Sequence, residues 1–151
     1  MQHFDSDYGE QLIERIRQIP EDATPLWGKM HRKDLIEHFI WVLHHAMGRS
    51  TQVPDFSNWF SRSVLKWLAM SGFLPIPKNL QLPTQLTSRG VTSQEPGDLE
   101  DLQAIIEEYL HLVQADELEP APHPLFGPLD VDGWDKLHVR HFEHHLKQFD
   151  K

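Results

Sequence analysis

Apolar residues recur along this chain at the spacing expected of amphipathic helices. The first such stretch covers residues 5–19, and its stripe consists of Tyr8, Leu12, Ile13, Ile16 and Ile19. The same spacing predicts helices over residues 31–47, ended by Gly48, and over residues 98–113, where Asp98 can cap the first turn. A last helix is predicted after Asp130, another suitable N-cap, and continues to about residue 149.

A shorter helix is predicted from residue 55 or 57 to residue 70, which is rich in aromatic and aliphatic side chains. Residues 71–97 contain several prolines and glycines without a sustained period, so we interpret them as a long crossover connection. Residues 117–129 form a second irregular segment, and no stretch alternates convincingly as a strand. The predicted fold is all-α: a single domain over residues 1–151, built as a four-helix bundle with long crossovers and one extra short helix.

Composition narrows the classes of function. The chain has 151 residues and no cysteine, so any metal must rest on histidine or carboxylate side chains. A net charge of −9 offers no basic surface, and we therefore expect no nucleic-acid partner. The sequence shows neither a run of about 18 apolar residues nor a signal-peptide pattern, so we expect a cytoplasmic protein without a membrane partner.

Histidines are concentrated in the last predicted helix, at positions 138, 141, 144 and 145. The i, i+4 spacing of His141 and His145 places their Cβ atoms about 5–6 Å apart on one helix face. That face also carries Trp134, whereas the charged residues lie on the opposite side. Two inward-facing imidazoles so close together could hold one metal ion.

A third ligand would have to come from a facing helix, and residues 31–47 offer two candidates. His38 and His45 both fall on the apolar side of that helix, seven residues apart, and periodicity does not choose between them. A zinc-peptidase site is not expected, because Glu143 follows His141 by two residues and falls on the opposite face.

Three stretches carry a resemblance to a known family. They are Trp27-Gly28-Lys29-Met30 followed eight residues later by His38, the sequence His-Pro-Leu-Phe-Gly-Pro-Leu at 123–129, and Trp134 leading into His-x-x-His-His-Leu-x-Gln-Phe at 141–149. In these stretches the chain resembles the DinB/YfiT-like superfamily of metal-dependent proteins, and specifically a family of unknown function within it. The resemblance implies a four-helix bundle whose metal ligands are His38, His141 and His145. It thereby favours His38 over His45.

The resemblance also directs attention to residues around the ligands. Asp34 stands where the superfamily usually has a polar amide, so it could orient His38 or alter the charge balance at the metal. Trp41 is expected to border the pocket, and His45 could assist the site. His138 could line the pocket, although core packing is its default interpretation, and His144 is expected to flank the site or to be half-exposed.

Three imidazoles leave a coordination position open, which is typical of catalytic metal sites. Zinc or nickel would suit such ligands, and the open position could activate a water or a thiol. Superfamily relatives include thiol-dependent S-transferases, and their bundles commonly dimerise. The resemblance therefore implies a metal-dependent thiol transferase or hydrolase, acting on a low-molecular-weight thiol or other small molecule, and a homodimer. The alternatives are a non-catalytic metal- or ligand-binding bundle with a structural or stress-related role, and a metal-free bundle with ordinary hydrogen-bonded histidines.

Overall fold

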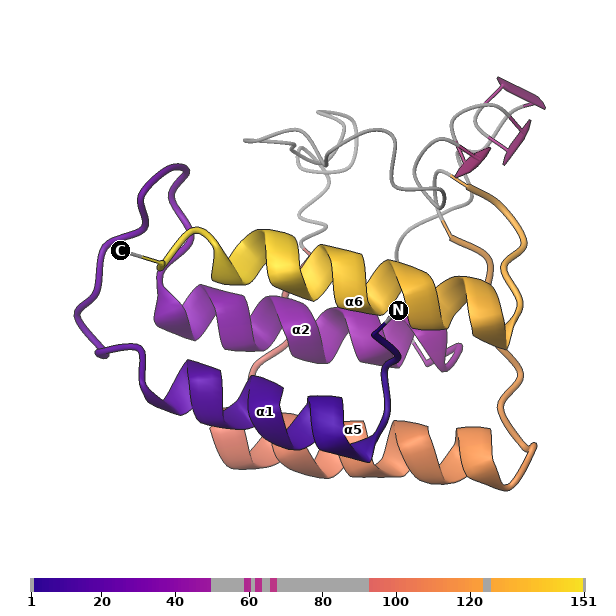
Figure 1. Cartoon of the computed structure of the whole chain (residues 1–151), viewed down its shortest axis with the longest axis horizontal. Coiled ribbons are helices and arrows are strands. Elements are labelled where there is room, and N and C mark those ends of the chain that lie inside the picture. The colour runs from indigo at the N-terminus through magenta and orange to yellow at the C-terminus, as the bar shows by residue number, and fades with distance from the viewer. Residues whose placement is uncertain are drawn as a thin grey trace.

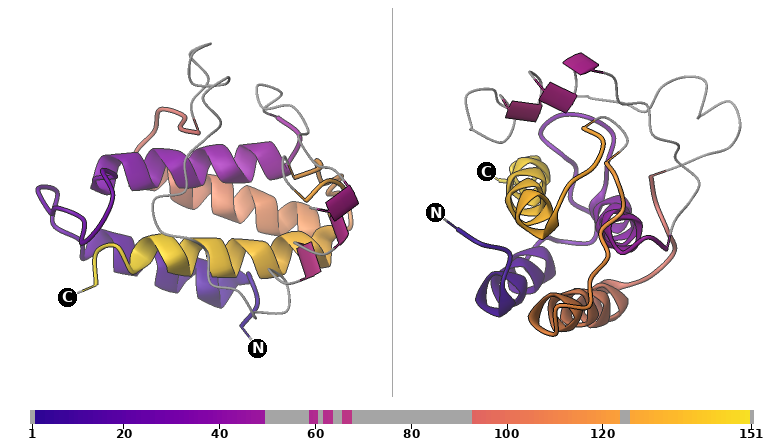
Figure 2. Two further views of the ribbon diagram at one scale, coloured as in Figure 1. Left: turned by 90° about the horizontal axis from the view of Figure 1, so that it is seen from above. Right: turned by 90° about the vertical axis from the view of Figure 1, so that its right-hand side faces the viewer.

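Four helices form the described part of the protein. The computed structural model describes residues 2–49, 59–60, 62–63, 66–67, 93–123 and 126–150. The helices are α1 (Ser6–Arg17), α2 (Arg32–Ala46), α5 (Leu99–Gln114) and α6 (Val131–Leu146). They run side by side as a bundle (Figure 1), and the end-on view in Figure 2 places one at each corner, with α5 diagonally opposite α6. The predicted all-α four-helix bundle is confirmed.

Side-chain caps fix where these helices begin. The Asp5 carboxylate accepts a hydrogen bond from the Tyr8 backbone N–H at 2.9 Å, and that of Asp130 accepts one from Gly133 at 2.7 Å. At the start of α5, Asp98 and Asp101 cap each other's backbone N–H reciprocally. These bonds satisfy amides of the first helical turn that have no partner within the helix, so three helices start where the sequence predicts.

The apolar stripes of the four helices meet in one core. Its largest fully buried side chains are Trp134, Tyr8, Tyr109, Phe39, Phe142, Leu12, Ile16, Leu35, Ile40, Leu43, Leu102 and His138. The backbone of α1 packs against the side chain of Ile106 of α5 at Gly9, where a Cβ atom would lie 2.9 Å from Cγ2 of Ile106. The absence of a side chain at Gly9 is therefore what allows the two helices to pack at this distance.

Two predicted features lie largely outside the described residues, namely the shorter helix over residues 55–70 and the crossover over residues 71–97. The irregular segment before α6 is described except at residues 124–125. Within it, His123 and Gly127 exchange backbone hydrogen bonds of 2.8 and 2.9 Å, and Gly127 adopts a φ of 70°. This pairing is an isolated bridge, and the described residues contain no β-strand.

Three backbone contacts hold irregular segments against the helices. The N–H of Glu95 donates to the Glu37 carbonyl of α2 at 3.1 Å, and the N–H of Ala121 donates to the Ala46 carbonyl at 3.1 Å. The N–H of Leu26 donates to the carbonyl of Gln148, just beyond α6, at 2.6 Å. These contacts place residues 93–95 and 26–27 beside the facing surfaces of α2 and α6. In the described part of the chain, no helix combines the length and apolarity required to cross a membrane.

Candidate metal centre

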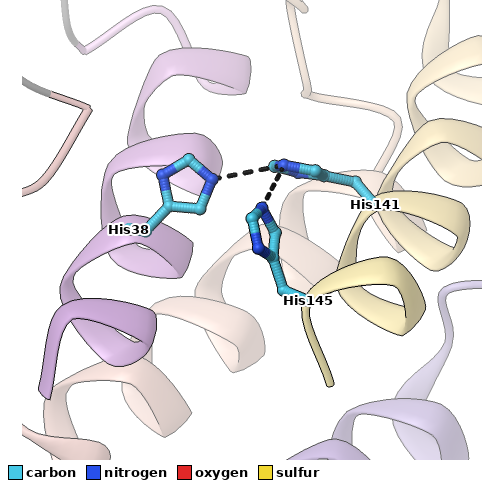
Figure 3. A group of neighbouring side chains, drawn as sticks. All are labelled: His38, His141 and His145. Atoms are coloured by element: carbon cyan, nitrogen blue, oxygen red, sulfur yellow. Dashed lines mark hydrogen bonds between the residues drawn. The ribbon is translucent and has the colours of Figure 1, made fainter. Parts of the chain in front are cut away.

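Three histidine side chains converge between α2 and α6. His38 projects from α2, and His141 and His145 project from successive turns of α6 (Figure 3). Nε2 of His141 lies 3.2 Å from Nε2 of His38 and 3.0 Å from Nε2 of His145. One ring nitrogen from each of the three lies within 4.8 Å of the other two. The structure thus brings together the three residues that the resemblance implies as ligands.

Hydrogen bonds outside the cluster set the tautomer of two of these rings. Nδ1 of His38 lies 2.7 Å from the backbone oxygen of Ser93. A carbonyl oxygen can only accept, so Nδ1 of His38 carries the proton and Nε2 keeps its lone pair. Nδ1 of His145 lies 2.7 Å from Oε1 of Gln148 and donates to it in the same way. Both rings therefore direct an unprotonated Nε2 toward His141.

The arrangement leaves more acceptors than donors at the centre of the cluster. Nε2 of His141 faces two lone pairs and can donate a proton to only one of them. At least one nitrogen lone pair therefore remains without a donor among the three rings. A cation at the centre would pair with such a lone pair, which otherwise lacks a hydrogen-bond donor among the three rings. The residues present fit a divalent metal ion, because three neutral imidazoles are a common ligand set for zinc and related metals.

Burial keeps the three imidazoles in the neutral form that binds metals. Burial lowers the pKa of His38 to about 4, against a smaller opposing effect of the hydrogen bond to Ser93. Burial and the neighbouring His38 lower the pKa of His145 to about 3. Burial, followed by the proximity of His145 and His38, holds the pKa of His141 well below its usual range. His141 and His145 nevertheless retain partial exposure, so one side of the cluster is open.

The model of one protein family matches residues 8–151, and its description is "Protein of unknown function (DUF1569)". The chain belongs to the DUF1569 family. The matched region contains all three histidines of the cluster. No curated protein and no solved structure matches the chain. Membership of the DUF1569 family assigns no activity to the chain.

The second histidine of α2 that periodicity offered lies apart from the cluster in this DUF1569 chain. Nε2 of His45 lies 3.0 Å from the backbone oxygen of Pro122, so it donates to the segment that precedes α6. Trp41 stacks on both His38 and His45, with its ring centroid 6.1 Å from that of His38 and 5.4 Å from that of His45 and the rings nearly parallel in both pairs. Trp41 therefore borders the cluster, and His45 lies on its far side.

Asp34 makes no hydrogen bond to the ring of His38. Its carboxylate accepts hydrogen bonds from the backbone N–H of His31 at 3.0 Å and from Nε2 of Gln94 at 3.1 Å. Gln94 adjoins Ser93, whose carbonyl holds His38. Asp34 thus helps to hold the segment that orients His38, and its effect on the ring is indirect.

The two remaining histidines of α6 have different surroundings. His138 is fully buried, with its ring stacked between Trp134 and Phe142 at centroid distances of 5.2 and 5.4 Å. It forms part of the aromatic core and makes no hydrogen bond to the cluster. His144 is half-buried and packs near the rings of Trp27 and His145, at 6.0 and 5.3 Å.

Glu143 faces α1, on the other side of α6 from the cluster. Its carboxylate accepts hydrogen bonds from the hydroxyl of Tyr8 at 2.9 Å and from the guanidinium of Arg15 at 2.6 Å. No carboxylate belongs to the three-histidine group found among the described residues. This position agrees with the predicted placement of Glu143 on the face of the helix opposite His141.

The sequence patterns assigned no role to Ser93 or Gln148, the two residues that hold the rings of His38 and His145. Ser93 acts through its backbone carbonyl, which every residue possesses, so its side chain carries no signal. Gln148 is different, because it is only 5% exposed and follows His145 by three residues. A buried amide one helical turn from a candidate ligand is a recognisable signal for a side chain that orients a ligand.

Proposed function

We propose that this protein binds one divalent metal ion through Nε2 of His38, His141 and His145, and that it is a metal-dependent protein of the DinB-like kind. The observation that supports this proposal is the convergence of three Nε2 atoms, two of which are unprotonated because their Nδ1 atoms donate elsewhere. The resemblance of its motifs to the DinB/YfiT-like superfamily supports the same ligand set independently of the geometry.

The donor atoms favour zinc or nickel. All three donors are neutral imidazole nitrogens, the chain contains no cysteine, and no carboxylate joins the group among the described residues. Hard cations such as magnesium and calcium prefer oxygen ligands, so the site is poorly suited to them. Three protein ligands would leave at least one coordination position for a small molecule.

The reaction that we propose is Lewis-acid activation of a small nucleophile, in a thiol transfer or a hydrolysis. A bound divalent ion would supply that Lewis acidity. The chain's own contribution is to keep the three imidazoles neutral by burial and to fix two of their tautomers through Ser93 and Gln148. Trp41 supplies an apolar wall beside His38. The superfamily resemblance supports a low-molecular-weight thiol as the partner.

Metal content is the first test. Purified protein is stripped with a chelator, titrated with Zn²⁺ and Ni²⁺ by calorimetry, and compared with His141→Ala and with His111→Ala. His111 is exposed on α5, so its replacement controls for the loss of any histidine. We expect one ion per chain in the parent protein and in His111→Ala, and none in His141→Ala. Absence of stoichiometric binding, or equal binding by all three proteins, would refute the proposal.

A second experiment separates the catalytic proposal from a structural clamp between α2 and α6. If the ion only clamps these helices, removing it should lower the melting temperature strongly, because binding energy then contributes directly to folding. If the site is catalytic, we expect a modest thermal shift and metal-dependent turnover in a thiol-S-transferase or hydrolase assay. Turnover that persists in His141→Ala, or a large thermal shift without turnover, would contradict the catalytic role.

A further inference from the structure

Gln148 connects one histidine of the cluster to the loop between α1 and α2. Its Oε1 accepts the hydrogen bond from Nδ1 of His145 at 2.7 Å, and its Nε2 donates to the backbone oxygen of Trp27 at 3.2 Å. The backbone carbonyl of Gln148 accepts a further bond from the N–H of Leu26 at 2.6 Å. One buried residue therefore joins residues 26–27 to the ring of His145.

The second contact of the amide decides which way it faces. An amide group has one accepting oxygen and one donating nitrogen, and the carbonyl of Trp27 can only accept. The nitrogen of Gln148 must therefore face Trp27, which leaves the oxygen facing His145. An oxygen at that position requires the proton of His145 to lie on Nδ1. The Trp27 carbonyl thus fixes the tautomer of His145 through the intervening amide.

We propose that Gln148 is a positioning residue that holds His145 in the tautomer whose Nε2 lone pair points at His141. This inference rests on the proposed metal-binding function. Without the amide oxygen, His145 could place its proton on Nε2, in the centre of the cluster, and that proton would have to be moved before a metal could bind. A hydrogen-bond partner on the outer nitrogen also restricts rotation of the ring and raises its basicity as a ligand.

Two substitutions separate the parts played by the amide. Gln148→Met keeps the length and approximate shape of the side chain but removes both the acceptor and the donor. Gln148→Glu keeps an oxygen that accepts from His145 while removing the amide nitrogen that donates to Trp27. We expect Gln148→Met to weaken zinc binding by about 10–100-fold, the usual effect of losing such a partner, and Gln148→Glu to remain close to the parent protein.

The tautomer is measured in metal-free protein by long-range nitrogen–proton correlation spectra of the imidazoles, at a pH well above 7. In the parent protein and Gln148→Glu we expect the His145 proton on Nδ1, and in Gln148→Met on Nε2 or on both nitrogens. Zinc affinity is then measured by competition with a chromophoric chelator. Circular dichroism shows which variants fold, and if Gln148→Met does not, Gln148→Glu alone decides, because a shifted proton there would overturn the inference.

The outcomes separate this inference from the function on which it rests. A parent protein that binds no zinc refutes the proposed function, while the metal-free spectra still test the effect of Gln148 on the tautomer. If the parent binds zinc but Gln148→Met binds it equally well with the proton still on Nδ1, the positioning role is refuted and the metal site stands. A fall in affinity that is also seen with Gln148→Glu would indicate a general loss of structure and would likewise refute it.

Discussion

Substitution of His138 by leucine should make the fold less sensitive to acid. His138 is fully buried among four aromatic rings, with centroids 5.2 Å from Phe4, 5.1 Å from Tyr109, 5.2 Å from Trp134 and 5.4 Å from Phe142. Neither ring nitrogen has a hydrogen-bond partner in the described part of the chain. A buried imidazole in such surroundings is stable only when neutral, because its charged form would lose hydration without gaining a partner.

The size of the effect follows from the pKa of this group. Burial, and to a smaller extent the nearby His123, lowers the pKa of His138 to about 3, from 6.5 in the unfolded chain. Between these values the unfolded state binds more protons than the folded state, so the free energy of unfolding falls as the pH falls. The free energy of unfolding that depends on His138 being neutral is fully present above about pH 6.5. About 2 kcal/mol of it is lost near pH 5, and the whole of it, about 5 kcal/mol, is lost below about pH 3.

The assay is urea unfolding of metal-free parent protein and His138→Leu at a series of pH values between about 8 and 5. Leucine is similar in size and favours the helix, and any constant packing difference cancels when the two pH profiles are subtracted. We expect the leucine variant to gain about 2 kcal/mol relative to the parent as the pH falls from about 8 to 5. A difference that stays constant over this range would refute the reasoning, since His138 would then have a partner for its charged form.

Three further substitutions test the packing and the choice of ligands. Gly9→Val should destabilise the bundle by about 1–3 kcal/mol, because the new Cβ would lie 2.9 Å from Cγ2 of Ile106. Urea unfolding measures this loss. An unchanged unfolding midpoint would contradict the prediction, since α1 and α5 could then move apart without cost. His38→Ala should abolish stoichiometric zinc binding, whereas His45→Ala, on the same helix, should retain it because that side chain bonds to the Pro122 carbonyl. Equal loss in both variants by calorimetry would mean that His45 belongs to the site.

The positions of the helices could be predicted from the sequence because nearby residues determine where each helix begins and which side faces the core. Apolar residues at helical spacing and an aspartate at each of three N-caps are sufficient to place α1, α5 and α6 to within a few residues. The connection over residues 71–97 offered no comparable pattern. Its expected role as a crossover depended on prolines and glycines alone, which indicate where a helix is unfavourable but not where the chain goes.

The choice between His38 and His45 shows what helical periodicity cannot determine. Residues seven apart differ by only about 20° around a helix, so both face inward and differ mainly in their height along the bundle. The neighbours of each histidine depend on its position along the bundle axis. His45 packs against residues 121–122, whereas His38 faces His141. The family resemblance favoured His38, and the geometry brings His38 into the cluster for a reason that lies in tertiary structure.

Comparison of His138 and His145 shows why burial alone does not identify a metal ligand. Both lie on α6, and burial lowers the pKa of each to about 3. The difference lies in their second nitrogens. Nδ1 of His145 is held by Gln148, so its lone pair is directed at two other imidazoles, whereas no described residue hydrogen-bonds either nitrogen of His138. A lowered pKa therefore shows only that both residues are buried. A candidate metal ligand differs from an imidazole of the core because a hydrogen bond fixes its tautomer and its unprotonated nitrogen faces other imidazole nitrogens.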